Sequence, residues 1–197
     1  VLNATPDSFY EGSRSTAFKE QQNLVNHLVQ DGADIIDIGG MSSRPGAKIV
    51  SSEEELSRIE PIVSYCLQQY PDVWISIDTL HAKTARAMLE KGVHMINDIS
   101  GGQFDLDLID LLQLHRSPYV CMHMRGTPED MITLNSYDDM IHEIMVYFKK
   151  RIELLRQKGV TDIIIDPGFG FAKNIDQNFN LLRELHKLQI FDCPILI

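Results

Sequence analysis

Short apolar runs alternate along the chain with longer stretches in which apolar residues recur every three or four positions. The short runs have strand length and are rich in Ile and Val, as parallel strands buried on both faces usually are. We predict strands at residues 1–2, 34–38, 73–78, 94–99, 119–124, 162–166 and 194–197.

The stretches between these runs have the period of amphipathic helices. Such helices are predicted around residues 24–29, 56–67, 82–90, 108–112, 141–155 and 179–185. We expect Ser52 to cap the second helix, with Glu55 reaching back to it as a capping box. Gly92 and Gly159 should mark the ends of the third and fifth helices, since glycine is the common residue just past a helix.

The alternation of strand and helix, repeated six times before a seventh strand, predicts an α/β fold with a parallel sheet. Such a sheet can either close into a (β/α)8 TIM barrel or remain an open, doubly wound sheet. The open sheet more often carries a glycine-rich phosphate loop after its first strand, and the sequence has no G-x-G-x-x-G or Walker-type loop. The barrel is therefore favoured. We expect residues 1–197 to be a single-domain fragment of it, from a stub of strand one to strand seven, with the last strands and helices missing.

Polar residues stand at the carboxyl ends of these apolar runs. They are Asn3, Asp37, Asp78, Asn97, Asp98, His123, Arg125 and Asp166. In a barrel these strand ends form the rim that carries the active site. Side-chain alternation predicts that Asp78, Asn97 and Asp166 share an inward face and converge there. His123 has two readings, a structural hydrogen bond or a substrate contact.

Two carboxylates and a carboxamide suit a flat heterocycle that presents N–H donors along one edge, as an amino-pyrimidinone does. The alternative is that each group only caps a helix or pairs with an arginine. The position of all three at strand ends favours a shared site over three separate caps.

Two loops add candidate chemistry on the same rim. Residues 3–9 mix amide, hydroxyl, carboxylate and aromatic side chains around a proline, which indicates either a functional loop or a turn that satisfies its own backbone. Residues 39–47 place Arg44 among glycines and serines, a suitable grip on phosphate or carboxylate oxygens, although plain loops have a similar composition. A hard cation such as Mg²⁺ could lie between the amide oxygen of Asn3 and substrate phosphates.

Composition excludes several classes of protein. The net charge of -10 and the pI near 5.1 argue against a nucleic-acid partner. No apolar run approaches the roughly 20 residues that span a bilayer, and no signal-peptide pattern is present. The three cysteines are widely spaced and lack a C-x-x-C pair, which favours reduced, buried thiols over a zinc site and predicts a cytoplasmic protein.

Several segments, taken in order, resemble those of the dihydropteroate synthase family. They are residues 3–9, 34–40, 39–47, 76–79, 96–100, 122–126 and 166–171. The resemblance covers the whole chain and is far more specific than one motif. It implies a (β/α)8 transferase that joins 6-hydroxymethyl-7,8-dihydropterin pyrophosphate to p-aminobenzoate. The products would be 7,8-dihydropteroate, for folate biosynthesis, and pyrophosphate, and the enzyme would be a sulfonamide target.

The resemblance also implies roles for single residues in the pterin site. Asp78, Asn97 and Asp166 would line the pterin pocket. The residues packing on the ring would be Ile99, Met122 and Phe171. Asp78 would stabilise the pterin cation that remains when pyrophosphate leaves.

The other implied roles lie in the two loops. Phe9, Ser43 and Pro45 would flank p-aminobenzoate, and Arg44 would contact an anionic group. Asn3 would help to hold the Mg²⁺ bound to pyrophosphate. With Asp78, the residues Asn3 and Arg44 would then be the catalytic ones.

The chain departs from the family pattern at two positions, with Met41 where many relatives have Glu and Ser43 where many have Thr. The family's basic Ser-Arg-Lys loop and its late Arg and His would lie beyond Ile197. We therefore expect residues 1–197 alone neither to close a barrel nor to turn over. The family further implies small-molecule substrates, a homodimer, and neither nucleic-acid nor membrane partners.

Two rival functions remain open. One is a methyltransferase module that delivers a methyl group from methyltetrahydrofolate to a corrinoid protein; it shares the barrel and the pterin-reading groups but does not need both loops. The other is a non-catalytic paralogue that binds a pterin or a partner protein. Retention of Asn3, Arg44, Asp78, Asn97 and Asp166 argues against the second reading.

Overall fold

Six parallel strands form one sheet whose spatial order follows the sequence, β1-β2-β3-β4-β5-β6. The computed structural model describes residues 1–4, 14–42 and 46–197. The strands are β1 (Leu2–Asn3), β2 (Ile35–Gly39), β3 (Trp74–Asp78), β4 (Met95–Asp98), β5 (Tyr119–Met122) and β6 (Ile163–Asp166). The first six predicted strands are thus present, with small shifts at their ends.

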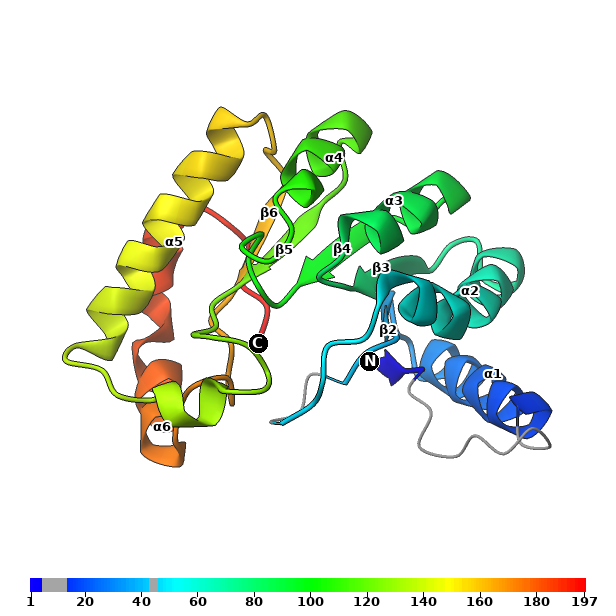
Figure 1. Cartoon of the computed structure of the whole chain (residues 1–197), viewed down its shortest axis with the longest axis horizontal. Helices are drawn as coiled ribbons and strands as arrows, with labels where there is room; N and C mark the ends of the chain where they lie inside the picture. Colours follow the sequence, from blue (N-terminus) through cyan, green and yellow to red (C-terminus); the bar gives the residue numbers. More distant parts are fainter. Residues whose placement is uncertain (5–13, 43–45) are drawn as a thin grey trace.

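The main helices lie along the outer face of the curved sheet (Figure 1). They are α1 (Arg14–Gln30), α2 (Ser52–Gln69), α3 (Ala82–Lys91), α4 (Asp107–His115), α5 (Met140–Gln157) and α6 (Ile175–Glu184). Two 3₁₀ segments complete the elements, η1 (Met131–Leu134) and η2 (Leu185–Phe191). A doubly wound sheet would reverse its strand order at a switch point and carry helices on both faces. The unbroken order and the single helical layer confirm the barrel-type α/β fold.

The predicted seventh strand is only partly formed. Residues 194–197 lie beside β6, where Ile165 N donates to Pro194 O and Leu196 N donates to Ile165 O, both at 2.9 Å. A single parallel bridge joins Ile165 to Ile195. Among the described residues this segment pairs only with β6. Because the pairing consists of one bridge, it is too short to count as a strand.

The main core lies between the outward face of the sheet and the helices. Its largest fully buried side chains include Ile36, Ile38, Ile75, Ile77, Ile96, Tyr119 and Phe148. Successive residues of a strand point to opposite faces, so the polar residues between these apolar ones point inward, away from the helices. The core therefore fixes which side chains face the interior of the barrel.

The start of α2 corrects the predicted capping box. The cap is Ser51, whose side chain accepts a hydrogen bond from Glu54 N at 3.2 Å. Ser52 is already the first helical residue, and Glu55 points into the protein, where it is fully buried. A capping box does form at α6, between Asn174 and Gln177.

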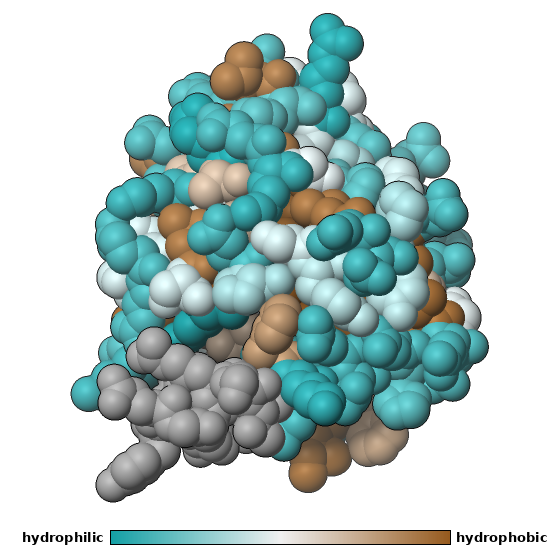
Figure 2. Space-filling view, turned by 90° about the vertical axis from the view of Figure 1, so that its right-hand side faces the viewer, coloured by the Kyte–Doolittle hydropathy of each residue, from teal (hydrophilic) through white to brown (hydrophobic). Residues whose placement is uncertain are grey.

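Surface and cysteines agree in part with the sequence expectations. No helix in the described part of the chain is both long and apolar enough to cross a membrane. The face drawn in Figure 2 is largely hydrophilic, with apolar side chains scattered over it. Cys66 and Cys121 are buried free thiols, and burial raises the pKa of Cys66 to about 11 and that of Cys121 to about 12. Cys193 is less buried than predicted.

Candidate active site

The carboxyl ends of β2 to β6 carry a group of half-buried polar side chains on the inward face of the sheet. The register pairs Asp78 with Asn97 on neighbouring strands, and Met122 with Asp166. Residues paired in a parallel ladder share a face, so Asp78 and Asn97 lie side by side. The inward face that side-chain alternation predicted for these residues is therefore confirmed.

Asp78 lies at the centre of this acidic group. Burial raises the pKa of Asp78 well above its usual range, and four neighbouring carboxyl groups raise it further. They belong to Asp37, Glu55, Asp98 and Asp166. Each added negative charge in this interior disfavours ionisation of the next. The site therefore favours a ligand that brings N–H donors or positive charge.

Asp37 belongs to the same site and was missed as a site residue in the sequence. Asn97 Nδ2 donates to Asp37 Oδ2 at 3.1 Å, which links β2 to β4 across the interior. The other oxygens of this pair, Asp37 Oδ1 and Asn97 Oδ1, are buried and have no hydrogen-bond partner among the described residues. A buried acceptor without a donor is costly, so these two oxygens match a ligand that donates. Alternation along 34–38 would have placed Asp37 inward.

Asp166 lies at the end of β6, where the loop to α6 begins. Its Oδ1 accepts a hydrogen bond from Gly168 N at 2.7 Å, and its pKa is raised chiefly by burial. The hydrogen bond fixes one carboxylate oxygen toward the loop. The loop then returns over the rim and ends at α6.

An apolar cluster separate from the main core lies over this rim. It contains the three residues predicted to pack on the ring, Ile99, Met122 and Phe171, together with Met41, Leu80, Met124, Met131 and Ala172. Methionine side chains adapt easily to a planar ligand. Met41, one of the departures from the family pattern, is thus a buried member of this wall.

Behind the rim, α2 supports the glycine pair at the end of β2. Arg58 Nη1 donates to Gly40 O at 2.7 Å. A Cβ on Gly40 would lie 2.9 Å from the backbone oxygen of Glu55, so only glycine fits. Glu55 Oε2 in turn accepts from Thr79 Oγ1 at 2.6 Å, and burial raises the pKa of Glu55. These contacts fix the backbone that leads into residues 43–45.

His123 and Lys173 form a second polar feature that the sequence did not single out as a site. Lys173 is only 8% exposed, and its Nζ lies 3.1 Å from His123 Nδ1. Burial lowers the pKa of Lys173 to about 7 and that of His123 to about 3. His123 therefore makes a structural hydrogen bond, the first of the two readings left open.

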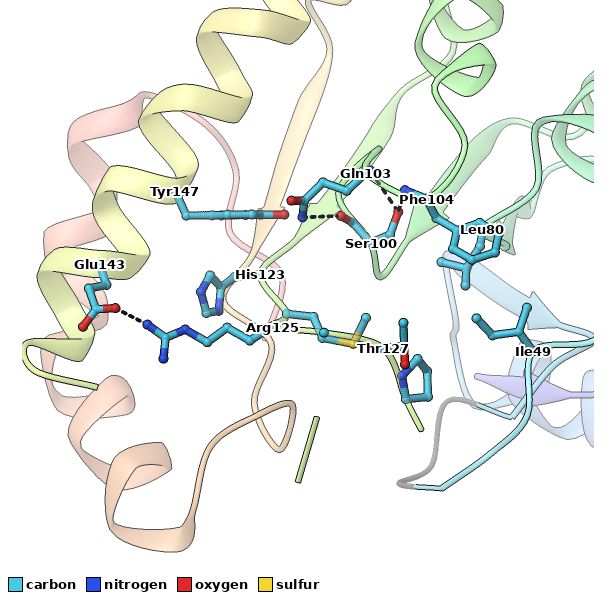
Figure 3. Close-up of a pocket in the computed structure, with 13 residues that line it drawn as sticks. Ile49, Leu80, Ser100, Gln103, Phe104, His123, Arg125, Thr127, Glu143 and Tyr147 are labelled. Carbon is cyan, nitrogen blue, oxygen red and sulfur yellow. Dashed lines mark hydrogen bonds and ion pairs between the residues drawn. The ribbon is translucent and has the colours of Figure 1, made fainter. Parts of the chain in front are cut away.

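A cavity of about 510 Å³ lies between the loops after β4 and β5 and helix α5, and it shares Leu80 and Met124 with the apolar cluster over the rim (Figure 3). Arg125 and Glu143 form an ion pair on its wall, and the Arg125 guanidinium stacks over Tyr137 at 3.8 Å. Tyr147 Oη donates to Met122 O, and Gln103 Nε2 donates to Ser100 O. Because these polar groups already have partners in the protein, they are not among the unpartnered buried atoms of the described residues.

Asn3 is exposed at the end of β1, next to Gly39 in the ladder. An amide oxygen is a suitable ligand for Mg²⁺, which usually keeps several waters and substrate phosphates in its shell. The described residues contain no group of three or more His, Cys, Asp or Glu side chains placed to hold a metal. The other loop candidates, Phe9 and residues 43–45, lie outside the described residues.

Comparison with known proteins gives one consistent family. The model of the pterin binding enzyme family matches residues 1–197. A curated dihydropteroate synthase of Synechocystis is 44% identical over the whole chain, which spans 68% of that protein.

Two solved structures agree. The Yersinia pestis dihydropteroate synthase with a sulfonamide drug has a TM-score of 0.90 and 37% identity, over 98% of this chain and 70% of that one. The Xanthomonas albilineans enzyme with 4-aminobenzoic acid has a TM-score of 0.89 and 35% identity, over 98% of this chain and 69% of that one.

Proposed function

Because the chain belongs to the dihydropteroate synthase family of pterin-binding enzymes, we propose that it carries the pterin half of that transferase reaction. The complete enzyme would join 6-hydroxymethyl-7,8-dihydropterin pyrophosphate to p-aminobenzoate and release pyrophosphate. The observation that carries the proposal is the inward acidic face, where the buried Asp37 Oδ1 and Asn97 Oδ1 have no donor within the described part of the chain. An amino-pyrimidinone edge supplies donors of that kind.

In this proposal Asp78, Asn97 and Asp166 bind the donor edge of the pterin ring. A carboxylate accepts two parallel N–H bonds from an exocyclic amine and a neighbouring ring N–H. Asp37 acts with Asn97, because their hydrogen bond at 3.1 Å orients the amide. Ile99, Met122 and Phe171 pack on the ring faces, as members of the cluster over the rim.

The acidic face also suits the chemistry. When pyrophosphate leaves, the pterin becomes electron-poor, and the amine of p-aminobenzoate attacks the exposed carbon. Fixed negative groups near the ring stabilise the developing positive charge without reorganising during the reaction. Asp78 has the most carboxyl neighbours of the three pterin-binding candidates, so we assign it the main share of this stabilisation.

The loops at residues 3–9 and 39–47 would bind the leaving group and the second substrate. Asn3 would supply one oxygen ligand to Mg²⁺, which supplies charge neutralisation of pyrophosphate when bound. Arg44 would contact an anionic group, and Phe9, Ser43 and Pro45 would flank p-aminobenzoate. Calorimetry of pyrophosphate binding with and without Mg²⁺ tests the role of Asn3. We expect Asn3→Ala to remove most of the Mg²⁺-dependent gain in affinity.

The assembled enzyme is proposed to be a cytoplasmic homodimer, as the resemblance implies. Native mass spectrometry of the full-length protein tests the dimer, and cell fractionation tests the location.

A turnover assay on the full-length chain tests the function. With the pterin pyrophosphate, p-aminobenzoate and Mg²⁺ we expect dihydropteroate and one equivalent of pyrophosphate. Methyl transfer from methyltetrahydrofolate to a corrinoid protein would instead identify the methyltransferase module. Pterin binding without either turnover would identify a non-catalytic paralogue.

A further inference from the structure

The loop between β6 and α6 carries two members of the proposed pterin site. It begins at Asp166 and passes Phe171 before the helix starts at Ile175. Its backbone is tightly folded, with positive φ angles at Gly168, Gly170 and Ala172. Ala172 is not a glycine, so its φ of 50° persists only where surrounding contacts enforce it.

Lys173, at the end of the loop, supplies part of those contacts. Its Nζ donates to Gly168 O and Phe171 O, both at 2.9 Å. It also donates to His123 Nδ1 at 3.1 Å and lies 3.5 Å from His123 O. One ammonium group thus joins both ends of the loop to the segment that follows β5.

The loop is pressed against that segment without spare room. His123 N donates to Asp166 O at 2.9 Å, and a Cβ on Gly168 would overlap the backbone oxygen of His123. Gly168 N donates a hydrogen bond to Asp166 Oδ1, and Gly168 O accepts one from Lys173 Nζ. Only one residue therefore separates the buried lysine from the pterin-binding carboxylate.

We propose that Lys173 is a positioning residue for the pterin: it clamps the β6–α6 loop onto the end of β5 and so holds Asp166 and Phe171 in their binding arrangement. The inference deepens the proposed function and rests on it. Among the described residues no acceptor of Lys173 is a carboxylate, so the lysine does not serve as an ordinary salt-bridge partner. Its acceptors are carbonyl oxygens and one imidazole nitrogen, so its hydrogen bonds orient the backbone.

The charged groups around Lys173 determine the pH range in which it is protonated and can make all of these hydrogen bonds. Asp166 on β6 favours its protonated form, whereas Arg125 in the loop after β5 and burial disfavour it. His123, the remaining titratable neighbour, is neutral because burial lowers its pKa to about 3. A protonated lysine has three donors and a neutral one has two, so the clamp weakens as pH rises through the pKa of Lys173, about 7.

The first experiment compares full-length Lys173→Met with wild type, using calorimetry with 6-hydroxymethylpterin and steady-state kinetics. Methionine keeps the length of the stem and removes the donors. We expect the Kd of the pterin to rise about 10- to 100-fold, as for other losses of support around a site. The KM for p-aminobenzoate should change little. Lys158→Met is the matched control, since Lys158 is exposed just past the C-terminal end of α5 and, among the described residues, forms an ion pair with Asp110 alone.

The pH profile separates positioning from mere stability. In the folded protein the pKa of Lys173 lies below its usual value. Above pH 7 the unfolded chain therefore binds more protons at this lysine than the folded protein does. For this reason the contribution of Lys173 to the free energy of unfolding increases as pH rises. Pterin affinity should move the opposite way and fall above about pH 7. The difference between wild type and Lys173→Met should show this inflection.

Each outcome decides a different claim. If the wild type binds no pterin, the proposed function fails. If the wild type binds and Lys173→Met binds equally well at every pH, the positioning role fails. If Lys173→Met does not fold, Arg125→Gln replaces it: removing this cation should move the inflection to higher pH, and an unmoved inflection overturns the proposal.

Discussion

The two faces of the same sheet obey opposite rules. On the outward face Ile38, Ile77 and Ile96 are fully buried and belong to the main apolar core beneath the helices. On the inward face Asp37, Asp78 and Asn97 alternate with them and are half-buried, and one oxygen each of Asp37 and Asn97 has no hydrogen-bond partner among the described residues.

A stable core avoids unpaired acceptors and crowded carboxylates. Their presence one residue away from a well-packed core shows that this face is built for a ligand. The difference between the faces is therefore a difference between stability and function, and substitutions on each face should have different consequences.

The largest effect is expected at Asp78. Asp78→Asn should lower kcat/KM of the full-length enzyme by about 10²–10³-fold, because the amide, unlike the carboxyl, cannot ionise when the pterin cation forms beside it. The same change should raise the melting temperature at neutral pH, since it relieves the crowding of buried carboxyl groups. Steady-state kinetics and calorimetric melting check the two halves. A loss of both activity and stability would place Asp78 among the packing residues.

On the outward face the neighbouring residue should behave in the reverse way. Ile77→Ala should cost about 2–5 kcal/mol in the free energy of unfolding, because it opens a cavity in a fully buried site. The kcat per folded molecule should remain near the wild-type value. Ile77→Val is the matched control, with an expected cost of about 0.5–1.5 kcal/mol. Urea unfolding and active-site titration give these quantities.

A smaller effect is expected at Asp37. Asp37→Ala leaves Asn97 without its partner, so the Kd of the pterin should rise about 10-fold, which corresponds to roughly 1.4 kcal/mol. The KM for p-aminobenzoate should stay unchanged. Calorimetry with 6-hydroxymethylpterin measures the first, and kinetics the second. Equal losses for both substrates would mean that Asp37 supports the fold in general.

The smallest effect tests the start of α2. Ser51→Ala should cost about 1 kcal/mol in unfolding free energy, because Ser51 accepts the hydrogen bond from Glu54 N. Ser52→Ala, at the next position, should cost only a few tenths of that amount. Reversed costs would show that the predicted capping box forms in solution. Chemical denaturation measures both variants.

The sequence predicted the strands well, because buried parallel strands leave long apolar runs at a regular spacing. It also predicted the inward face of Asp78, Asn97 and Asp166 from alternation alone. It missed the cap of α2, because Ser51 and Ser52 are chemically equal and only the backbone path distinguishes them. The predicted seventh strand lies beside β6 but is formed only as a single bridge.

The supporting residues of the site were harder to predict. Lys173 lies in a polar stretch that looks like surface, and nothing local shows that three backbone and imidazole acceptors surround it. Asp37 was visible as a polar residue at a strand end, but its pairing with Asn97 crosses a whole strand. Such contacts depend on the curvature of the sheet, which a local pattern does not contain.

Discrimination between two ligands tests the central claim most directly. The full-length enzyme is titrated in a calorimeter with 6-hydroxymethylpterin and with the analogue that lacks the exocyclic amine. If the inward acceptors bind the donor edge, the analogue should bind at least about 100-fold more weakly, because buried acceptors would stay unpaired. Equal affinities would contradict the account, since the inward face would then not bind the pterin through its N–H donors.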